Sequence, residues 1–210
     1  ETMLTEAAER GTITAYEIGT ALALLFFARQ KVDIAVLEIG LGGRLDAVNA
    51  VTPLVSVITS LSLDHMAVLG NTIEQIAFEK AGIIKPGVPV LTVPQWPAAL
   101  PVLQEIAAER GTTLQVVEPA HLAGDNLRPG PEFRHLSSQR LQIKYGPQEI
   151  ETDLPLLGEH QRLNAALAAA VVWEQQQRPG GLAVPPAAVT KGFAQVWWPA
   201  RLQLLEDRRG

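Results

Sequence analysis

Apolar stretches alternate with helix-forming stretches between residues 14 and 117, and this alternation restricts the chain to few folds. Four short apolar runs are typical of buried strands, and helical patterns precede and separate them. Buried strands that alternate with helices are typical of a parallel sheet covered on both faces. The sequence therefore predicts an α/β fold with a mostly parallel sheet flanked by helices. We expect strands at 32–39, 54–61, 88–93 and 112–117. One helix is expected to begin at Thr14, and two others to cover 72–82 and 99–110.

The first helix carries its own start signal. Thr14 and Glu17 have the spacing of a capping box, in which each residue's side chain accepts a hydrogen bond from the other's backbone. Apolar residues follow with the 3.6-residue period of a helix and form one continuous face: Ile18, Ala21, Leu22, Leu25 and Phe26.

The pattern changes after about residue 120. A loop is expected over 121–135, followed by a small β-hairpin over 140–156 that turns near Gly146–Pro147. A strong helix is predicted at 160–177, and Pro186 suits the first turn of a final helix. The sequence thus predicts a hairpin insertion beside the parallel sheet.

Composition excludes several classes of protein. The net charge of −5 argues against a nucleic-acid-binding surface, which is usually basic. The chain has no cysteine, which excludes disulfides, thiolate metal sites and thiol nucleophiles and fits a reducing compartment. The longest apolar run, Ala21–Ala28, is much shorter than the roughly 20 residues of a membrane span. We therefore expect a cytoplasmic protein, monomeric, with no membrane or nucleic-acid partner.

Three side chains form a candidate site. Glu38 and His65 each follow a predicted strand, and Lys80 lies in the next predicted helix. Open α/β sheets bind ligands beyond the carboxyl ends of their strands, so these groups are expected to meet on one rim. A carboxylate is a natural ligand for Mg²⁺, whereas histidine better suits Zn²⁺ or Mn²⁺. The spacing alone therefore does not name the metal.

Each of these residues also has a purely structural interpretation. Glu38 could cap a helix or pair with Arg44, and Asp64 could act as a cap with His65 hydrogen-bonded beside it. Lys80 could be a solvated helix residue, since isolated lysines are rarely buried. The glycines after Glu38 could merely permit a tight turn with positive φ.

A dinucleotide-binding module is an alternative from another class. The G-x-G of "IAVLEIGLGGRL" follows a predicted strand, but Leu45 occupies the third-glycine position, where the helix normally packs on the strand. A further alternative is a non-catalytic remnant of an enzyme. The acid, imidazole and amine of the candidate site are all retained, which argues against degeneration.

Five longer stretches are specific when taken together: "LEIGLGGRLDAVN", "SLDH", "FEKAGI", "GEHQRLNAALA" and "PARLQ". In this order and spacing they resemble the folylpolyglutamate synthase and dihydrofolate synthase family of the Mur ligase superfamily, from about Thr14 to Gln203. The resemblance implies an ATP-dependent ligase. In that family, a substrate carboxylate receives the γ-phosphate of ATP, and L-glutamate attacks the resulting acyl phosphate. The carboxylate belongs to dihydropteroate or to a folate that already carries glutamate.

The resemblance also assigns roles to the three candidate residues. Glu38 and His65 match ligands of two Mg²⁺ ions, so His65 is implied to bind magnesium despite the general preference of imidazole. Lys80 matches a lysine that reacts with CO₂ to give a carbamate, which turns a cation into a carboxylate-like anion. That reaction requires the neutral amine, and hence a lowered lysine pKa.

Further residues are implied to bind substrates. Asp46 matches a residue near the pterin ring, and the glycine loop before it is expected to leave room for substrate. Gln161 and Asn164 match nucleotide contacts, and Arg201 matches an arginine that reaches the ATP phosphates.

The resemblance implies parts that this sequence does not contain. The P-loop pattern G-x-x-x-x-G-K-[ST] is absent from it, although family members carry one N-terminal to the matching region. A C-terminal glutamate-ligase domain is expected but absent as well. We therefore expect residues 1–210 to be a partial Mur ligase-like central domain that binds ATP poorly and does not turn over by itself.

Overall fold

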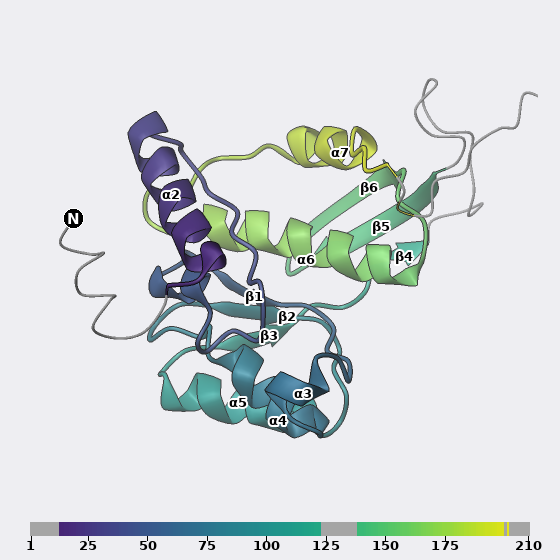
Figure 1. Cartoon of the computed structure of the whole chain (residues 1–210). Coiled ribbons are helices and arrows are strands. Elements are labelled where there is room, and N and C mark those ends of the chain that lie inside the picture. The colour runs from purple at the N-terminus through teal and green to yellow at the C-terminus, as the bar shows by residue number, and fades with distance from the viewer. Residues whose placement is uncertain (1–12, 123–137, 200, 202–210) are drawn as a thin grey trace, which may run out of the picture.

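The computed structural model describes residues 13–122, 138–199 and 201. A parallel sheet and an antiparallel sheet lie on opposite sides of one central helix, α6 (Glu159–Gln176), as Figure 1 shows. The described part of the chain starts with helix α2 (Ala15–Gln30) and a long connection, and the parallel sheet with its helices comes next. The antiparallel sheet and the last helices follow.

The parallel sheet has three short strands in the order β1 (Ser56–Ile58), β2 (Val90–Thr92) and β3 (Leu114–Val116). Helices α4 (Ile73–Ala81) and α5 (Ala99–Glu109) cover one face of this sheet. Helix α6 covers the other face, so the predicted α/β fold with a covered parallel sheet is confirmed.

The central strand explains why this arrangement is stable. Every residue of β2 is buried, and successive side chains of a strand point to opposite faces. Val90 belongs to the core on the α4 and α5 side, while Leu91 belongs to the core on the α6 side. The buried hydroxyl of Thr92 is satisfied, because it donates a hydrogen bond to the carbonyl oxygen of Ile58 at 2.8 Å.

The antiparallel sheet contains the predicted hairpin. Strands β5 (Gln139–Tyr145) and β6 (Gln148–Leu154) pair around the two-residue turn, where Gly146 has φ +54°. The sheet is larger than predicted, because β4 (His121–Leu122) adds a third strand. Helix α7 (Pro186–Ala194) packs on β6, with Pro186 in its first turn as expected. Most of the loop predicted over 121–135 lies outside the described residues.

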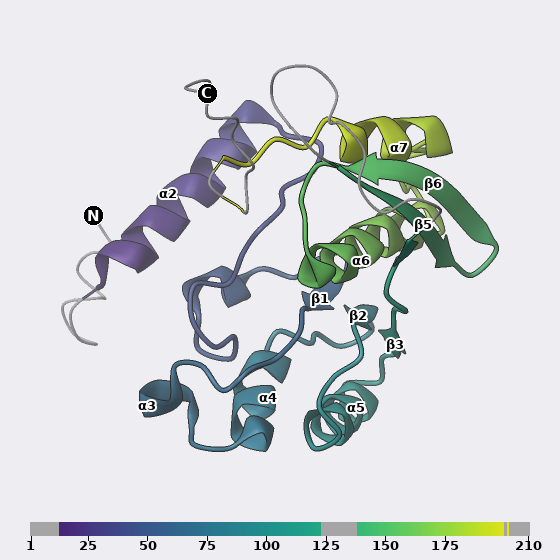
Figure 2. The same ribbon diagram turned by 90° about the vertical axis from the view of Figure 1, so that its right-hand side faces the viewer.

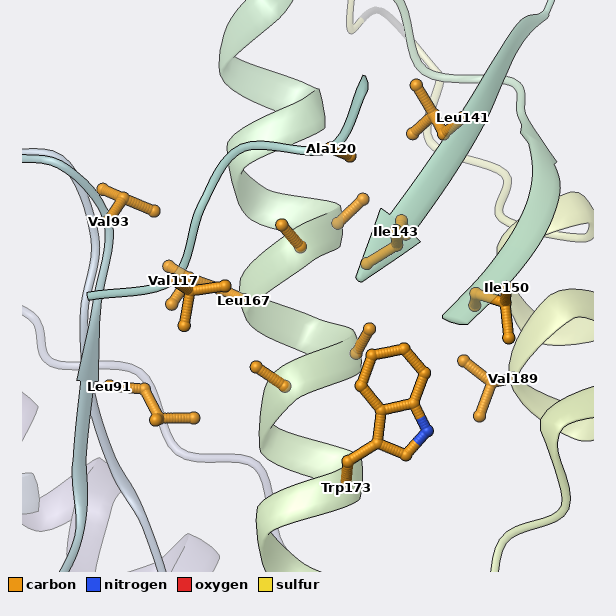
Figure 3. Packing of buried hydrophobic residues seen from close by; sticks show 14 of the residues in the cluster. Leu91, Val93, Val117, Ala120, Leu141, Ile143, Ile150, Leu167, Trp173 and Val189 are labelled. Atoms are coloured by element: carbon orange, nitrogen blue, oxygen red, sulfur yellow. The ribbon is translucent and has the colours of Figure 1, made fainter. Parts of the chain in front are cut away.

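The main core forms where α6 meets both sheets. Figure 3 shows Leu167 and Trp173 of α6 between Leu91 of β2 on one side and Ile150 of β6 on the other. The Trp173 ring stacks on Tyr145 of β5, with 6.3 Å between ring centroids. Seven residues of α6 are buried: Gln161, Ala165, Ala166, Leu167, Ala169, Ala170 and Trp173.

The strand predicted at 32–39 is wrong. This segment runs without regular secondary structure, and Val36 within it is 93% exposed. An apolar run becomes a strand only where a neighbouring strand satisfies its backbone N–H and C=O groups. Within the described ranges no strand pairs with it, and the parallel sheet begins at β1.

Helix α2 confirms its predicted capping box but buries none of its residues. Figure 2 shows it apart from both sheets, beyond the connection that leads to the parallel sheet. Across the described ranges, no helix combines the length and apolarity needed to cross a bilayer.

Candidate active site

The glycine loop that follows Glu38 is held together by Asp46. One carboxylate oxygen of Asp46 accepts hydrogen bonds from the backbone N–H groups of Gly40 and Leu41, at 3.0 and 2.9 Å. The other oxygen accepts from Val48 N–H at 2.9 Å and thereby caps the short 3₁₀ helix η1 (Ala47–Ala50). The side chain implied to lie near substrate therefore also organises its own loop.

The same bonds weigh against the dinucleotide alternative. A pyrophosphate in such a module would need the free N–H groups of the glycine turn and the start of an α-helix behind it. Here the N–H groups of Gly40 and Leu41 already donate to Asp46, and the turn leads into a 3₁₀ helix.

The glycines of the loop are explained by contacts with protein atoms. A Cβ on Gly40 would lie 2.5 Å from the Tyr16 ring, and one on Gly43 would lie 2.9 Å from the carbonyl oxygen of Glu79. Gly42 has φ +68°, and its Cβ would lie 2.9 Å from Leu69 of α3 (Met66–Leu69). The positions that a Cβ would occupy at these glycines are filled by Tyr16, α3 and α4, whereas the expectation that the loop leaves room for substrate stays a prediction.

The loop is fastened to the last turn of α4, which carries Lys80. The backbone N–H of Arg44 donates to the carbonyl oxygen of Glu79 at 2.8 Å. The Arg44 guanidinium forms a bidentate ion pair with the Glu79 carboxylate, with a shortest distance of 2.9 Å. Arg44 therefore does not pair with Glu38, and that structural interpretation of Glu38 is excluded.

Glu38 itself is exposed, and among the described residues no side chain pairs with its carboxylate. Lys80 is half-buried one residue after Glu79. A carboxylate without a protein partner is suited to a hard divalent cation that completes its coordination with water or phosphate oxygens. Its oxygen atoms are ligands of the kind that Mg²⁺ prefers.

His65 lies at the start of α3 in the left-handed conformation, with φ +52°. Its backbone N–H donates to the Asp64 carboxylate at 2.7 Å, and its Nε2 lies 3.7 Å from the other Asp64 oxygen. Both side chains are exposed. A non-glycine residue at positive φ in a loop is uncommon and often marks a functional position.

The segments that carry the three predicted ligands meet around the glycine loop. Gly42 lies against Leu69 of the short helix that His65 begins, and Gly43 lies against the carbonyl oxygens of Glu79 and Lys80. Within the described part of the chain no group of three His, Asp or Glu side chains forms a ready metal site. The predicted set includes only two such residues, Glu38 and His65, with a lysine as its third member.

The predicted nucleotide contacts lie elsewhere. Gln161 and Asn164 share one face of the first turns of α6, where the Asn164 amide lies 3.5 Å from the Gln161 side-chain oxygen. Gln161 is buried and Asn164 is exposed. Arg201 is exposed, with its guanidinium 5.6 Å above the Trp198 ring. No hydrogen bond or ion pair of the described residues joins these three to the glycine loop.

A protein family described as the Mur ligase middle domain matches residues 1–172 of this chain. The chain belongs to the Mur ligase family. Its matched relatives include the Bacillus subtilis dihydrofolate synthase/folylpolyglutamate synthase, 39% identical over 203 residues. A folylpolyglutamate synthase from Arabidopsis thaliana is 40% identical over 196 residues. The resemblance inferred from the motifs is therefore confirmed.

Solved structures agree with this Mur ligase assignment. The apo form of L. casei folylpolyglutamate synthase superposes with a TM-score of 0.81 at 32% identity, over 98% of this chain and 49% of that one. A complex of a folylpolyglutamate synthase with AMPPCP and folate superposes with a TM-score of 0.79 at 33% identity, over 96% of this chain. The match to the B. subtilis relative covers 95% of this chain but only 45% of that relative. The chain therefore spans about half the length of such proteins.

Sequence reasoning gave no role to Glu79 or Asn49 and treated Gly82 only as the end of a helix. All three residues lie in the quoted stretches, but their partners are far away in sequence: Glu79 pairs with Arg44 across 35 positions. Motif spacing did not identify these pairings, because the paired residues do not share a helix, strand or turn. Pairs between distant segments emerge from the tertiary structure.

Proposed function

We propose that this chain is part of an ATP-dependent ligase that joins L-glutamate to dihydropteroate or to a folate. The names of its relatives support the substrate class, since these are dihydrofolate and folylpolyglutamate synthases. The observation that carries the proposal is the packing of the loop after Glu38 onto the turn of α4 that bears Lys80. This contact brings the segments of two predicted active-site residues together.

In the proposed reaction, the carboxylate of the pterin substrate attacks the γ-phosphorus of ATP, which gives an acyl phosphate and ADP. The amino group of L-glutamate then forms a bond to the acyl carbon, loses a proton and displaces inorganic phosphate. Each intermediate carries dense negative charge, so the site must supply positive charge at fixed positions.

Glu38 and His65 would hold Mg²⁺, which when bound neutralises charge on the phosphate oxygens. Glu38 is suited to this role because its carboxylate is exposed and has no protein partner in the described part of the chain. Lys80 would help to hold the second ion as a carbamate. Its neutral Nζ would attack CO₂, forming an N–C bond and releasing a proton.

The remaining predicted residues would position substrates. Gln161 and Asn164 would contact the nucleotide, and Arg201 would contact its phosphates. Asp46 would contact the pterin while it holds the loop. Its carboxylate already accepts three backbone hydrogen bonds and a long one of 3.5 Å from the Tyr16 hydroxyl, so a substrate donor would take the place of Tyr16.

The complete protein encoded by the gene provides the first test. ADP release would be measured with L-glutamate and either dihydropteroate or tetrahydrofolate, and we expect glutamate-dependent turnover with at least one. Absence of turnover with both would refute the proposed function. The 210-residue chain alone is expected to show no turnover, and detectable glutamate-dependent ADP release from it would contradict that expectation.

Substitution of the proposed metal ligand provides a second test. Glu38→Gln removes the anionic oxygen with little change of shape. We expect kcat/KM to fall by at least about 100-fold, because charge stabilisation by a metal is worth several kcal/mol. Glu105→Gln, an exposed residue of α5, is the matched control and should leave activity unchanged. Wild-type activity in the Glu38 variant would show that Glu38 is not a metal ligand of the active site.

A further inference from the structure

We propose that Arg44 and Glu79 are a positioning pair for the ligase reaction. They fix the glycine loop against the last turn of α4 and so set the approach of Glu38 to Lys80. This inference rests on the proposed function. It assigns a role to two residues to which the proposed function gives none.

The side chains form a well-oriented ion pair. Arg44 Nε and one terminal nitrogen donate to the same Glu79 oxygen at 3.1 and 2.9 Å, and Nε also lies 3.3 Å from the second oxygen. The Glu79 side chain is 22% exposed and the Arg44 side chain 46%, and the Arg44 guanidinium lies 5.8 Å from the centre of the Phe78 ring. Multiple hydrogen bonds and the partial burial of Glu79 make this pair more directional than a typical surface pair.

The backbones beneath the pair approach as closely as glycine allows. A Cβ on Gly82 would lie 2.3 Å from Arg44 Cα, and one on Gly43 would lie 3.0 Å from the carbonyl oxygen of Lys80. The Arg44 N–H bond to the Glu79 carbonyl closes the same contact. The loop and the last turn of α4 are therefore in direct backbone contact, and a side chain at either glycine would force them apart.

A separate set of bonds keeps the region folded without the ion pair. The Asn49 amide donates to the carbonyl oxygens of Arg44 and Gly82 at 3.2 and 3.0 Å. Lys85 Nζ in turn donates to the Asn49 carbonyl oxygen at 2.7 Å. Removal of the ion pair should therefore loosen the loop while leaving its attachment in place.

The position of the pair links it to the chemistry. Arg44 belongs to the loop that continues directly from Glu38, and Glu79 precedes Lys80 in the same helical turn. A displacement of about 1 Å in reacting groups can lower a rate on the order of 100-fold. Loss of the pair is therefore expected to affect kcat more than substrate binding.

The test uses the complete protein with Arg44→Ala, Glu79→Gln and the double variant. Amide hydrogen exchange in peptides covering 40–46 should be about tenfold faster in each variant, since a local opening becomes easier. The kcat should fall about tenfold or more, with each KM within about threefold of wild type. The double variant should lose no more than either single variant, because the two residues act together.

Lys144→Ala is the matched control, because it removes an exposed ion pair of the β-hairpin, 3.4 Å from Glu149. It should alter neither loop exchange nor kcat. Unchanged loop exchange in the Arg44 and Glu79 variants would overturn the proposal, as would additive losses or faster exchange with wild-type kcat. If the wild-type protein shows no ligation, the proposed function fails, and the exchange measurements alone then decide whether the pair fixes the loop.

Discussion

Helices α2 and α6 show that the formation of a helix and its burial have different causes. Helix α2 has the stronger local start, with a complete capping box between Thr14 and Glu17. Helix α6 begins at Glu159, and its N-cap Gly158 provides no side-chain hydrogen bond. Yet α6 buries seven residues and α2 buries none. Local signals thus form the helix, whereas burial depends on what lies beside it.

The surroundings of the two helices account for the difference. The parallel and antiparallel sheets lie on two sides of α6, and both contribute apolar side chains to its core (Figure 3). Helix α2 touches mainly the glycine-loop region, where Tyr16 meets Gly40. Its apolar face, including Leu22 and Phe26, remains exposed in the described structure.

The largest expected effect comes from the same substitution on both helices. Leu167 of α6 is 2% exposed, whereas Leu22 of α2 is 61% exposed. Leu167→Ala should lower the free energy of unfolding by about 2–5 kcal/mol, because it leaves a cavity in the core. Leu22→Ala should change it by less than about 0.5 kcal/mol. Urea denaturation of both variants measures the difference. Equal losses of unfolding free energy would contradict the different burial of the two helices.

A smaller effect is expected from the helix caps. Thr72 caps α4, which lies in the core, and Thr14 caps the unburied α2; both form capping boxes. Each Thr→Ala change should cost its helix about 1 kcal/mol. At Thr72 this cost should appear as a lower global free energy of unfolding. At Thr14 it should appear instead as faster amide exchange within α2, with the global urea midpoint nearly constant.

The two outcomes at the caps are distinguishable in one experiment. Exchange of α2 peptides and the urea midpoint would be measured on the same preparations. A full drop in the global midpoint for Thr14→Ala would show that α2 unfolds together with the core.

The smallest expected effect is a pH dependence at the α6 core. Burial, the charge of Glu174 and a hydrogen bond from Tyr145 to Glu174 at 3.1 Å together raise the pKa of Tyr145 to about 12. A tyrosine in the unfolded chain titrates near 10. Between these values the folded state binds more protons, so the free energy of unfolding falls as pH rises from about 10 to about 12.

The chain has two tyrosines, one in each compared region, so each can be removed separately. Tyr145→Phe should reduce the loss of stability between pH 10 and 12, measured by urea midpoints, whereas Tyr16→Phe should not. In the Tyr16→Phe protein, the ultraviolet absorbance titration of the remaining tyrosine should have its midpoint near pH 12. A midpoint near 10 would contradict the partly buried environment of Tyr145 beside Glu174.

Much of the fold could be predicted because its signals are local. The capping box at Thr14, the turn at Gly146–Pro147 and the start of α7 at Pro186 each depend on a few neighbouring residues. The strand predicted at 32–39 failed because an apolar run does not specify its pairing partner. Asp46 shows the same limit in the site, since its hydrogen bonds to the loop could not be inferred from its motif role.

The sequence by itself determined the alternation of helices and strands, the family and the identity of the candidate ligands. Only the tertiary structure decided which apolar faces are buried, and that Arg44 pairs with Glu79 rather than with Glu38. The physical reason is the separation along the chain between the residues that interact. Caps, turns and periodicity are set by neighbours along the chain, whereas burial and ion pairing depend on distant segments that meet only after folding.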